Sequence, residues 1–223
     1  MFKKGIYTLL FGFLLLLTGC FEVIEEVTLN DDGSGDVTLT LNLSRSKTKI
    51  NSIMLLDSVN NYKVPSEAEV KKHFAEIVKT IENTSGISKV SNTIDMEEFI
   101  FTLSCSFDNI DALNTVISNF SSKKEAQRIK NHKHFAFDKA TQTFTRSYHY
   151  DVAKEIRNTN MKDRKIFETA SIRSIYRFSK PIVSSENKMA KISGSKKAIM
   201  LKVTAQDIIK NRNSIKNKIK LQN

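Results

Sequence analysis

Alternation of apolar and polar residues predicts β-structure in much of the chain after residue 21. Residues 36–43 alternate cleanly, with Val37, Leu39 and Leu41 on one face and threonines on the other. The run 22–29 precedes it, and the Asp-Gly turn between the two is typical of a β-hairpin. The predicted strands of the first half of the chain are 22–29, 36–43, 87–94 and 98–107.

Helical periodicity separates these strands. Ser66 and Glu69 have the spacing of a capping box, and apolar residues follow at helical intervals up to Ile81. Asp108 is expected to cap a second helix with Ile110 on its apolar face. The other expected elements are a short helix within 44–60, a hairpin of 133–137 and 143–150, a helix over 151–168, strands at 169–179, 188–193 and 198–203, and a short helix at 204–210.

This order of elements predicts an α+β fold, in which antiparallel strands and hairpins are covered by helices. We expect a signal peptide at 1–19, an α+β domain at 20–209 with a lobe boundary near 121–133, and a basic C-terminal tail at 210–223. Within the tail, isoleucines can share one helical face beside several cations. These cations are candidates for contact with anionic lipid head groups, and a frayed, solvated terminus is the alternative. They are Lys210, Arg212, Lys216, Lys218 and Lys220.

The first twenty residues form an export signal. Lys3 and Lys4 precede an uncharged run from Gly5 to Leu17, which as a helix spans roughly 20 Å, too short for a bilayer core of ~30 Å. Leu17-Thr18-Gly19-Cys20 then resembles the lipobox of bacterial lipoproteins. The resemblance implies diacylglycerol on the Cys20 sulfur, cleavage between Gly19 and Cys20, and an acyl chain on the new amino terminus. An ordinary secretory signal with a coincidental cysteine is the alternative.

The charge of the chain says little about its partners. The formal net charge is +11, and lysine greatly outnumbers arginine, the residue best suited to bidentate phosphate recognition. An excess of Lys, Asn and Ile is more typical of an AT-rich genome than of a nucleic-acid-binding protein. No aromatic residues are interleaved with the basic ones in the tail, so we expect no nucleic-acid partner.

Candidate metal ligands are few. His132 and His134 lie two residues apart, and His149 is expected on the partner strand of the same hairpin. Zinc needs three or four converging ligands, and histidines on a solvated strand face are the more usual arrangement. We therefore predict no metal and no cofactor beyond the covalent lipid on Cys20.

The chain carries none of the common catalytic motifs. It lacks the nucleophile elbow, the phosphate-binding loop, the zinc-protease helix and the dinucleotide fingerprint. The single remaining cysteine, Cys105, lies on the apolar face of its predicted strand, where a buried and inert thiol is expected. We predict that the protein is not an enzyme, with a hydrolase assembled from dispersed residues as an alternative.

Three stretches carry a resemblance to known proteins. They are the acidic and apolar strand directly after Cys20, the turn Asp32-Gly33-Ser34-Gly35, and the segment 176–183 followed by Asn187 and Gly194. Together they resemble lipoproteins of the Bacteroidetes type and, more loosely, LppM-like domains. The resemblance implies a mixed α+β domain that handles lipids or envelope partners.

The sequence therefore predicts a membrane-anchored envelope lipoprotein that binds a lipid or another envelope component. An assembly accessory that holds a protein partner is the alternative from another class. Phe21 and Glu22 follow the cysteine where an inner-membrane retention signal would place aspartate, and no dense acidic run of the surface-export type is present. We expect the outer membrane, facing the periplasm; the cell surface and the inner membrane are the other locations.

The lipid assignment predicts that Cys20→Ala abolishes incorporation of a radioactive fatty acid. Cys105→Ser is the matched control, because it removes the other cysteine and leaves the lipobox intact. The control should be labelled as the unaltered protein is. Full labelling of the Cys20→Ala protein would overturn the assignment.

Overall fold

The computed structural model describes residues 21–59, 61–119, 133–148, 169–210 and 212–223. The signal peptide, Cys20, the expected helix over 151–168 and all of the expected lobe boundary except Lys133 lie outside the described residues. The strands and helices below refer to the described part of the chain.

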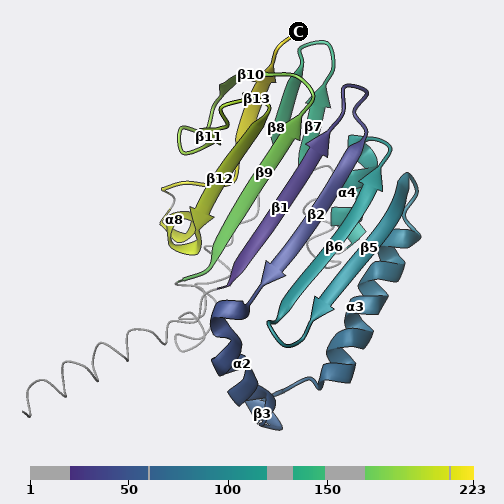
Figure 1. Cartoon of the computed structure of the whole chain (residues 1–223), viewed down its shortest axis with the longest axis vertical. Coiled ribbons are helices and arrows are strands. Elements are labelled where there is room, and N and C mark those ends of the chain that lie inside the picture. The colour runs from purple at the N-terminus through teal and green to yellow at the C-terminus, as the bar shows by residue number, and fades with distance from the viewer. Residues whose placement is uncertain (1–20, 60, 120–132, 149–168, 211) are drawn as a thin grey trace, which may run out of the picture.

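A seven-stranded sheet with β1 at its centre organises the molecule (Figure 1). Its order is β11-β12-β9-β1-β2-β6-β5. The strands are β1 (Glu22–Leu29), β2 (Gly35–Asn42), β5 (Ile87–Asp95), β6 (Ile100–Phe107), β9 (Ser171–Phe178), β11 (Lys191–Ile192) and β12 (Ala198–Thr204). All neighbours in it pair antiparallel except β1 and β9, which run parallel. The predicted α+β class, rich in antiparallel strands, is thus confirmed.

A smaller antiparallel sheet packs against one end of the large one. Its order is β10-β13-β8-β7, with β10 (Ile182–Ser185), β13 (Asn217–Leu221), β8 (Thr143–Arg146) and β7 (Phe135–Asp138). A two-stranded hairpin, β3 (Ser58–Val59) and β4 (Tyr62–Lys63), lies apart from both sheets.

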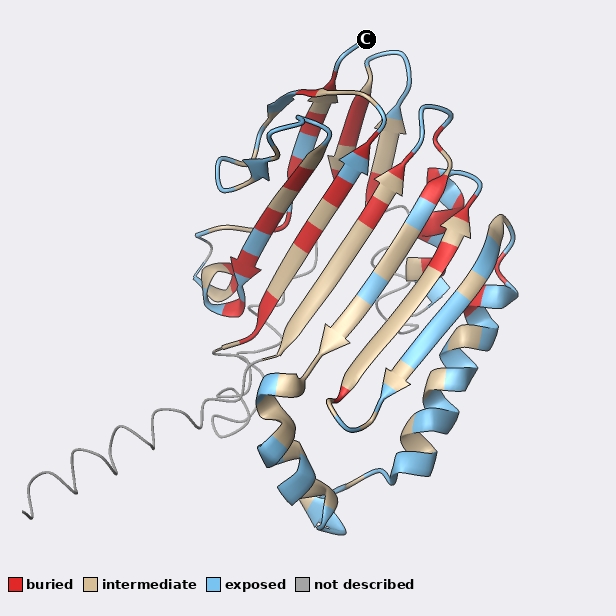
Figure 2. Ribbon diagram, viewed as in Figure 1, coloured by how far each residue is buried: buried red, intermediate tan, exposed pale blue. Residues whose placement is uncertain are grey.

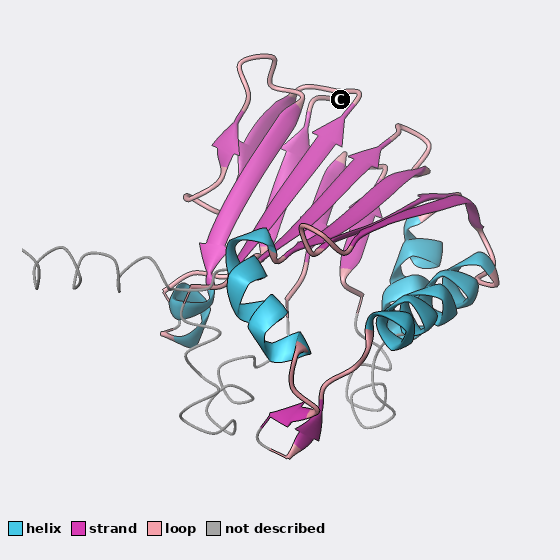
Figure 3. Ribbon diagram, turned by 60° about the horizontal axis from the view of Figure 1, so that its bottom comes forward, coloured by secondary structure: helices cyan, strands magenta, loops and turns pink. Residues whose placement is uncertain are grey.

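The helices lie on one side of the large sheet (Figure 3). They are α2 (Lys47–Met54), which follows the 3-10 turn η2 (Ser44–Ser46), α3 (Glu67–Glu82), α4 (Ile110–Asn119) and α8 (Ala205–Ile209). The predicted capping box begins α3, since Glu69 N donates to Ser66 Oγ and Ser66 N donates to the Glu69 carboxylate. At α4 the side chain that accepts from the first turn is Asn109, one residue after the expected Asp108.

We call the face of the large sheet that carries these helices the inner face. Alternate residues of β1 and β9 point there, and Val27, Leu29, Tyr176 and Phe178 are buried in one cluster with residues of α4 and the small sheet. Phe135 and Phe144 of the small sheet pack onto Tyr176 of the large sheet. The main core is therefore the contact between the two sheets.

A buried ion pair joins the two sheets inside this core. Arg146 of β8 donates from Nε and Nη2 to the two carboxylate oxygens of Glu25 of β1, at 3.1 and 2.8 Å. The Tyr176 hydroxyl donates to the same carboxylate at 2.7 Å, and the guanidinium lies 4.5 Å from the centre of the Phe135 ring. Burial raises the pKa of Tyr176 well above its usual value, so this hydroxyl stays protonated and serves as a donor.

The predicted C-terminal tail is wrong for residues 217–221. These residues form β13, between β10 and β8, and Ile219 is fully buried. Ile208 and Ile215 are buried as well, in a separate cluster with Leu201 and Val203 of β12. Alternation between lysine and an apolar residue in this segment has the period of a strand, and pairing on both sides satisfies its backbone.

Removing the guanidinium should destabilise the protein strongly. Arg146→Leu leaves the Glu25 carboxylate buried without its cation, a change that typically costs about 3–5 kcal/mol of unfolding free energy. The matched control is Arg177→Leu, which breaks an Arg–Glu pair with side chains 47% and 32% exposed, against 9% and 12% for Arg146 and Glu25. Exposed pairs contribute at most about 1 kcal/mol. Urea denaturation measures both, and equal losses would contradict the proposed role of the buried pair.

Candidate functional site

The inner face of the large sheet carries mostly apolar side chains on β1, β2 and β6, and burial along these strands is uneven (Figure 2). In the row where Leu29 and Phe107 flank Gly35 across the strands, both side chains are buried. Further along β2, Leu39 lies opposite Leu103 on the same face and is 45% exposed. Burial thus falls from one end of the inner face to the other.

The next row is also only partly covered by the described residues. Val23, Leu41, Phe101 and Ile94 lie side by side across β1, β2, β6 and β5, and all four are only half-buried. Phe74 of α3 packs on Phe101 with ring centroids 6.0 Å apart. We call the half-buried apolar side chains of these two rows the open inner face. Its members are Val23, Leu39, Leu41, Ile94, Phe101 and Leu103.

A cleft of about 560 Å³ lies beside α2, at the turn that joins β5 and β6. It is lined by α2 and its C-cap, the first turn of α3 and the β5–β6 turn: Lys47, Thr48, Asn51, Ser52, Met54, Leu55, Glu67, Met96 and Phe99. Met96 comes two residues after Ile94, and Phe99 two residues before Phe101. The cleft therefore adjoins the open inner face along the same hairpin.

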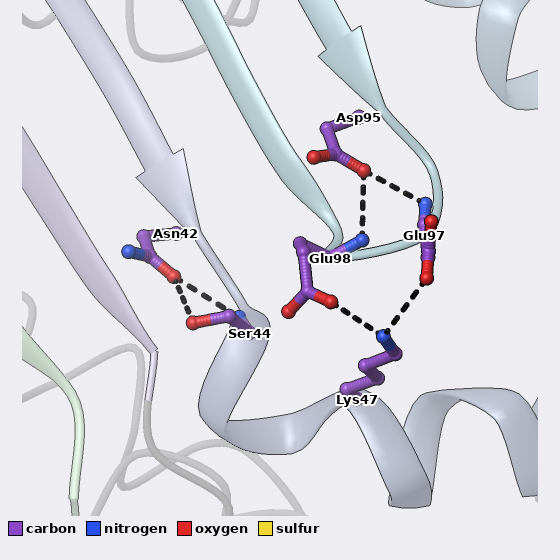
Figure 4. Close-up of polar contacts among 6 residues, drawn as sticks. All are labelled: Asn42, Ser44, Lys47, Asp95, Glu97 and Glu98. Atoms are coloured by element: carbon purple, nitrogen blue, oxygen red, sulfur yellow. Dashed lines mark hydrogen bonds and ion pairs between the residues drawn. The ribbon is translucent and has the colours of Figure 1, made fainter.

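Two side chains shape the backbone around this cleft (Figure 4). Asn42 Oδ1 accepts from the backbone N and the hydroxyl of Ser44, at 3.0 and 2.7 Å, where the chain turns from β2 toward α2. Asp95 Oδ1 accepts from the backbone N of Glu97 and of Glu98, at 2.9 and 2.8 Å, and closes the β5–β6 turn. These are local side-chain-to-backbone bonds of the kind that asparagine and aspartate form in turns.

One cation at the cleft is held in place by carboxylates. Lys47 Nζ lies 2.5 Å from Glu98 Oε1 and 3.8 Å from Glu97 Oε1 (Figure 4). The hydrogen bond to Glu98 raises the pKa of Lys47, so the ammonium is charged at neutral pH. A fixed ion pair beside apolar residues can position a polar group of a ligand. It supplies neither a nucleophile nor a base.

Apart from Glu22 of β1, whose pKa is lowered, against the effect of burial, by Lys202 and Arg173, the other perturbed carboxylates belong to turns and helix caps. The hydrogen bond from Lys63 lowers the pKa of Glu69 to about 2, and the one from Thr204 lowers that of Asp207. Backbone donation from Thr141 lowers the pKa of Asp138, and the Ser34 hydroxyl lowers that of Asp32. These groups are carboxylates at neutral pH, engaged in local structure.

Most residues singled out from sequence for lipidation and metal binding fall outside the described part of the chain. Gly19, Cys20, His132 and His149 are among them. His134 is described and is half-buried just before β7. The described residues contain no group of three or more His, Cys, Asp or Glu placed to hold a metal ion.

The isoleucines of the predicted tail do not share one helical face, because Ile208 belongs to α8 and Ile219 to β13, and the five tail cations lie on different elements. Lys210 and Arg212 follow α8, whereas Lys218 and Lys220 lie within β13. Lys218 is 4.0 Å from Glu186, and Lys220 Nζ donates to the Thr141 carbonyl. Lys216 is exposed just before β13. Their contact with lipid head groups stays a prediction.

Sequence reasoning missed the cleft and the exposure of Leu39. Lys47 and Glu98 are 51 residues apart, and no local pattern connects them. Leu39 alternates like its buried neighbours, so its pattern predicts an inward side chain without saying whether another element covers it.

Within the described residues, no helix combines the length and the apolar character needed to cross a bilayer.

Comparisons with known proteins show little. No family model matches the chain, and no curated protein matches its sequence. Among solved structures, the fold is weakly similar to the folded domain of the Mycobacterium tuberculosis protein LppM, determined by NMR. The match covers 92% of this chain and 91% of that one at 9% identity, with a TM-score of 0.43.

Cys105 should be unreactive in the folded protein. Its thiol is buried, and burial together with the charge of Asp36 raises its pKa to about 11, so the reactive thiolate is scarce at neutral pH. In a Cys20→Ser protein, a thiol reagent should label Cys105 only after unfolding. Val183→Cys on the exposed face of β10 is the positive control and should react at once. Labelling of Cys105 as fast as the control would contradict this prediction.

Proposed function

We propose that this chain is a lipid-anchored envelope protein whose α+β domain binds the apolar part of a lipid, or of a similar amphipathic envelope molecule, on the open inner face. The observation that carries the proposal is the incomplete cover, by the described residues, along one face of one sheet. Leu39 occupies a core position by its register and is 45% exposed.

The energetics favour a bound apolar group. Each square ångström of apolar surface removed from water contributes about 25 cal/mol, and contiguous uncovered apolar surface is typical of binding sites. Six half-open side chains lie in two adjacent rows of the sheet. An acyl chain laid across these rows would remove such surface from water.

The cleft beside α2 suits the polar part of the same ligand. Two of its apolar lining residues, Met96 and Phe99, belong to the turn of the hairpin that carries Ile94 and Phe101. Lys47 and Glu67 are the charged residues among those that line it. A few fixed polar groups next to an apolar surface are the usual arrangement of a small-molecule site.

The proposed role is non-enzymatic. Its support is the chemistry of the cleft, where the ion pair satisfies its own charges, and the downward shift of every carboxyl pKa that is resolved in the described residues. A general acid at neutral pH needs the opposite shift. No observation on the described residues favours the hydrolase alternative.

The anchor part of the proposal rests on the lipobox. Only Phe21 separates Cys20 from the first residue of β1, so a lipid on Cys20 would hold the open inner face close to a membrane. We propose the outer membrane facing the periplasm as its location. There the domain would be within reach of lipids leaving or entering the bilayer.

A charge placed on the open inner face should displace the ligand. Leu39→Lys puts an ammonium among apolar side chains and should reduce co-purified lipid at least about tenfold, the equivalent of 1.4 kcal/mol in binding. The matched control is Thr40→Lys, the next residue of β2, whose side chain lies on the opposite face of the sheet. It should retain the lipid.

Mass spectrometry of the protein extracted from its native membrane measures both. Native spectra count bound lipid, and denatured spectra separate it from the covalent lipid on Cys20. Absence of non-covalent lipid from the unaltered protein, or equal retention in Leu39→Lys and Thr40→Lys, would contradict the proposal.

A further inference from the structure

Three large apolar side chains are exposed on the segment between β2 and α3. Leu55 is the C-cap of α2, Leu56 follows it, and Tyr62 begins β4. They are 87%, 52% and 74% exposed, and Leu55 and Tyr62 are the two most exposed large apolar residues in the described chain. We call Leu55, Leu56 and Tyr62 the apolar tip.

The apolar tip projects past the end of the sheet at which β1 begins. The last residue of β2, Asn42, pairs with the first residue of β1, Glu22, and the chain enters α2 from there. Figure 1 shows α2 leading away from the strand ends, with β3 at its far end. Eight helical residues span about 12 Å, so the tip stands roughly that far from the sheet.

The same end of the sheet carries the attachment point of the lipid. Cys20 is two residues before Glu22, and two residues reach at most about 7 Å. A lipidated Cys20 therefore keeps the start of β1 at the membrane surface. The tip extends further from the sheet than this tether can reach.

The segment around the tip has the composition of an interfacial membrane contact. Between Ser44 and Lys63 there are four basic residues, Arg45, Lys47, Lys49 and Lys63, and one acid, Asp57. Lys47 and Lys63 are paired with glutamates, while their positions still flank the apolar side chains. Leucines that enter the acyl region, a tyrosine at head-group level and nearby lysines are typical of such contacts.

We propose that the apolar tip inserts into the interfacial layer of the membrane that holds Cys20, and so gives the domain a second, non-covalent contact. The proposal rests on the lipid anchor of the proposed function and extends it to orientation. Two contacts at one end fix the domain upright, with the open inner face and the α2 cleft near the bilayer. The cleft shares Leu55 with the tip, so insertion places the cleft at the membrane surface.

The chain offers a clean probe of insertion because it contains no tryptophan. In the full-length mature lipoprotein carrying Leu55→Trp, reconstituted in vesicles of phosphatidylethanolamine and phosphatidylglycerol, the emission should shift to shorter wavelength. Brominated acyl chains in the vesicles should quench most of it. Val183→Trp is the matched control, since Val183 is an exposed residue of β10 toward the other end of the molecule (Figure 1). Its emission should stay that of a water-exposed indole.

Flotation of the same vesicles separates this inference from the anchor. One outcome is that the protein floats with the vesicles but the indoles of Leu55→Trp and Val183→Trp are equally unquenched. This outcome would overturn the insertion and would not contradict the anchor. Protein that does not float at all would overturn the anchor, and the insertion with it.

A second variant tests orientation without a fluorophore. Leu55→Asp with Leu56→Asp removes the apolar contact, and because both side chains are exposed the melting temperature should be unchanged. When both proteins are anchored on vesicles, a protease should cleave the chain near α2 faster in the double variant than in the unaltered protein. The same cleavage rate for both proteins would overturn the proposal.

Discussion

The pairing of Arg146 with Glu25 is the interaction on which the two-sheet architecture depends. It joins the central strand of the large sheet to the small sheet through a bidentate contact, and Tyr176 and the Phe135 ring complete its surroundings. Two charges taken out of water are stabilising only when their geometry is satisfied, so the pair favours one docking of the sheets over others. The apolar core supplies most of the stability, and the ion pair supplies much of the specificity of this arrangement.

The same pair marks where the cover of the inner face ends. Val27, two residues beyond Glu25 on β1, is fully buried between the sheets. On the neighbouring strand Leu39 lies directly opposite Glu25 and is nearly half exposed. An antiparallel sheet usually has one covered face and one solvated face. Here the inner face has a buried part and a partly exposed part, and the partly exposed part lies at the start of β1, close in sequence to Cys20.

Local signals in the sequence predicted the elements well and their assembly less well. The capping box at Ser66 and the hairpin turn at Gly33 act within a few residues, so their pattern is readable without a fold. The strand at Ile219 was missed because its backbone partners, β8 and β10, are distant in the chain and its lysines resemble a solvated tail. The partner of Glu25 is 121 residues away in the chain. The exposure of Leu39 depends on how distant segments pack over its strand. Contacts of that range have no local signature.

The position of β1 has a consequence for biogenesis. In an exported chain, β1 would leave the translocation channel before the other described strands. In the folded protein it is the central strand of the large sheet. Its parallel neighbour β9 begins 149 residues later in the chain. Until β9 arrives, one edge of β1 presents unpaired backbone groups, the kind of edge that recruits other chains. Parallel pairing over so long a loop is also slow to form. Such a chain would expose this strand edge to other chains until β9 is synthesised, and a chaperone that binds the edge in that interval would reduce aggregation.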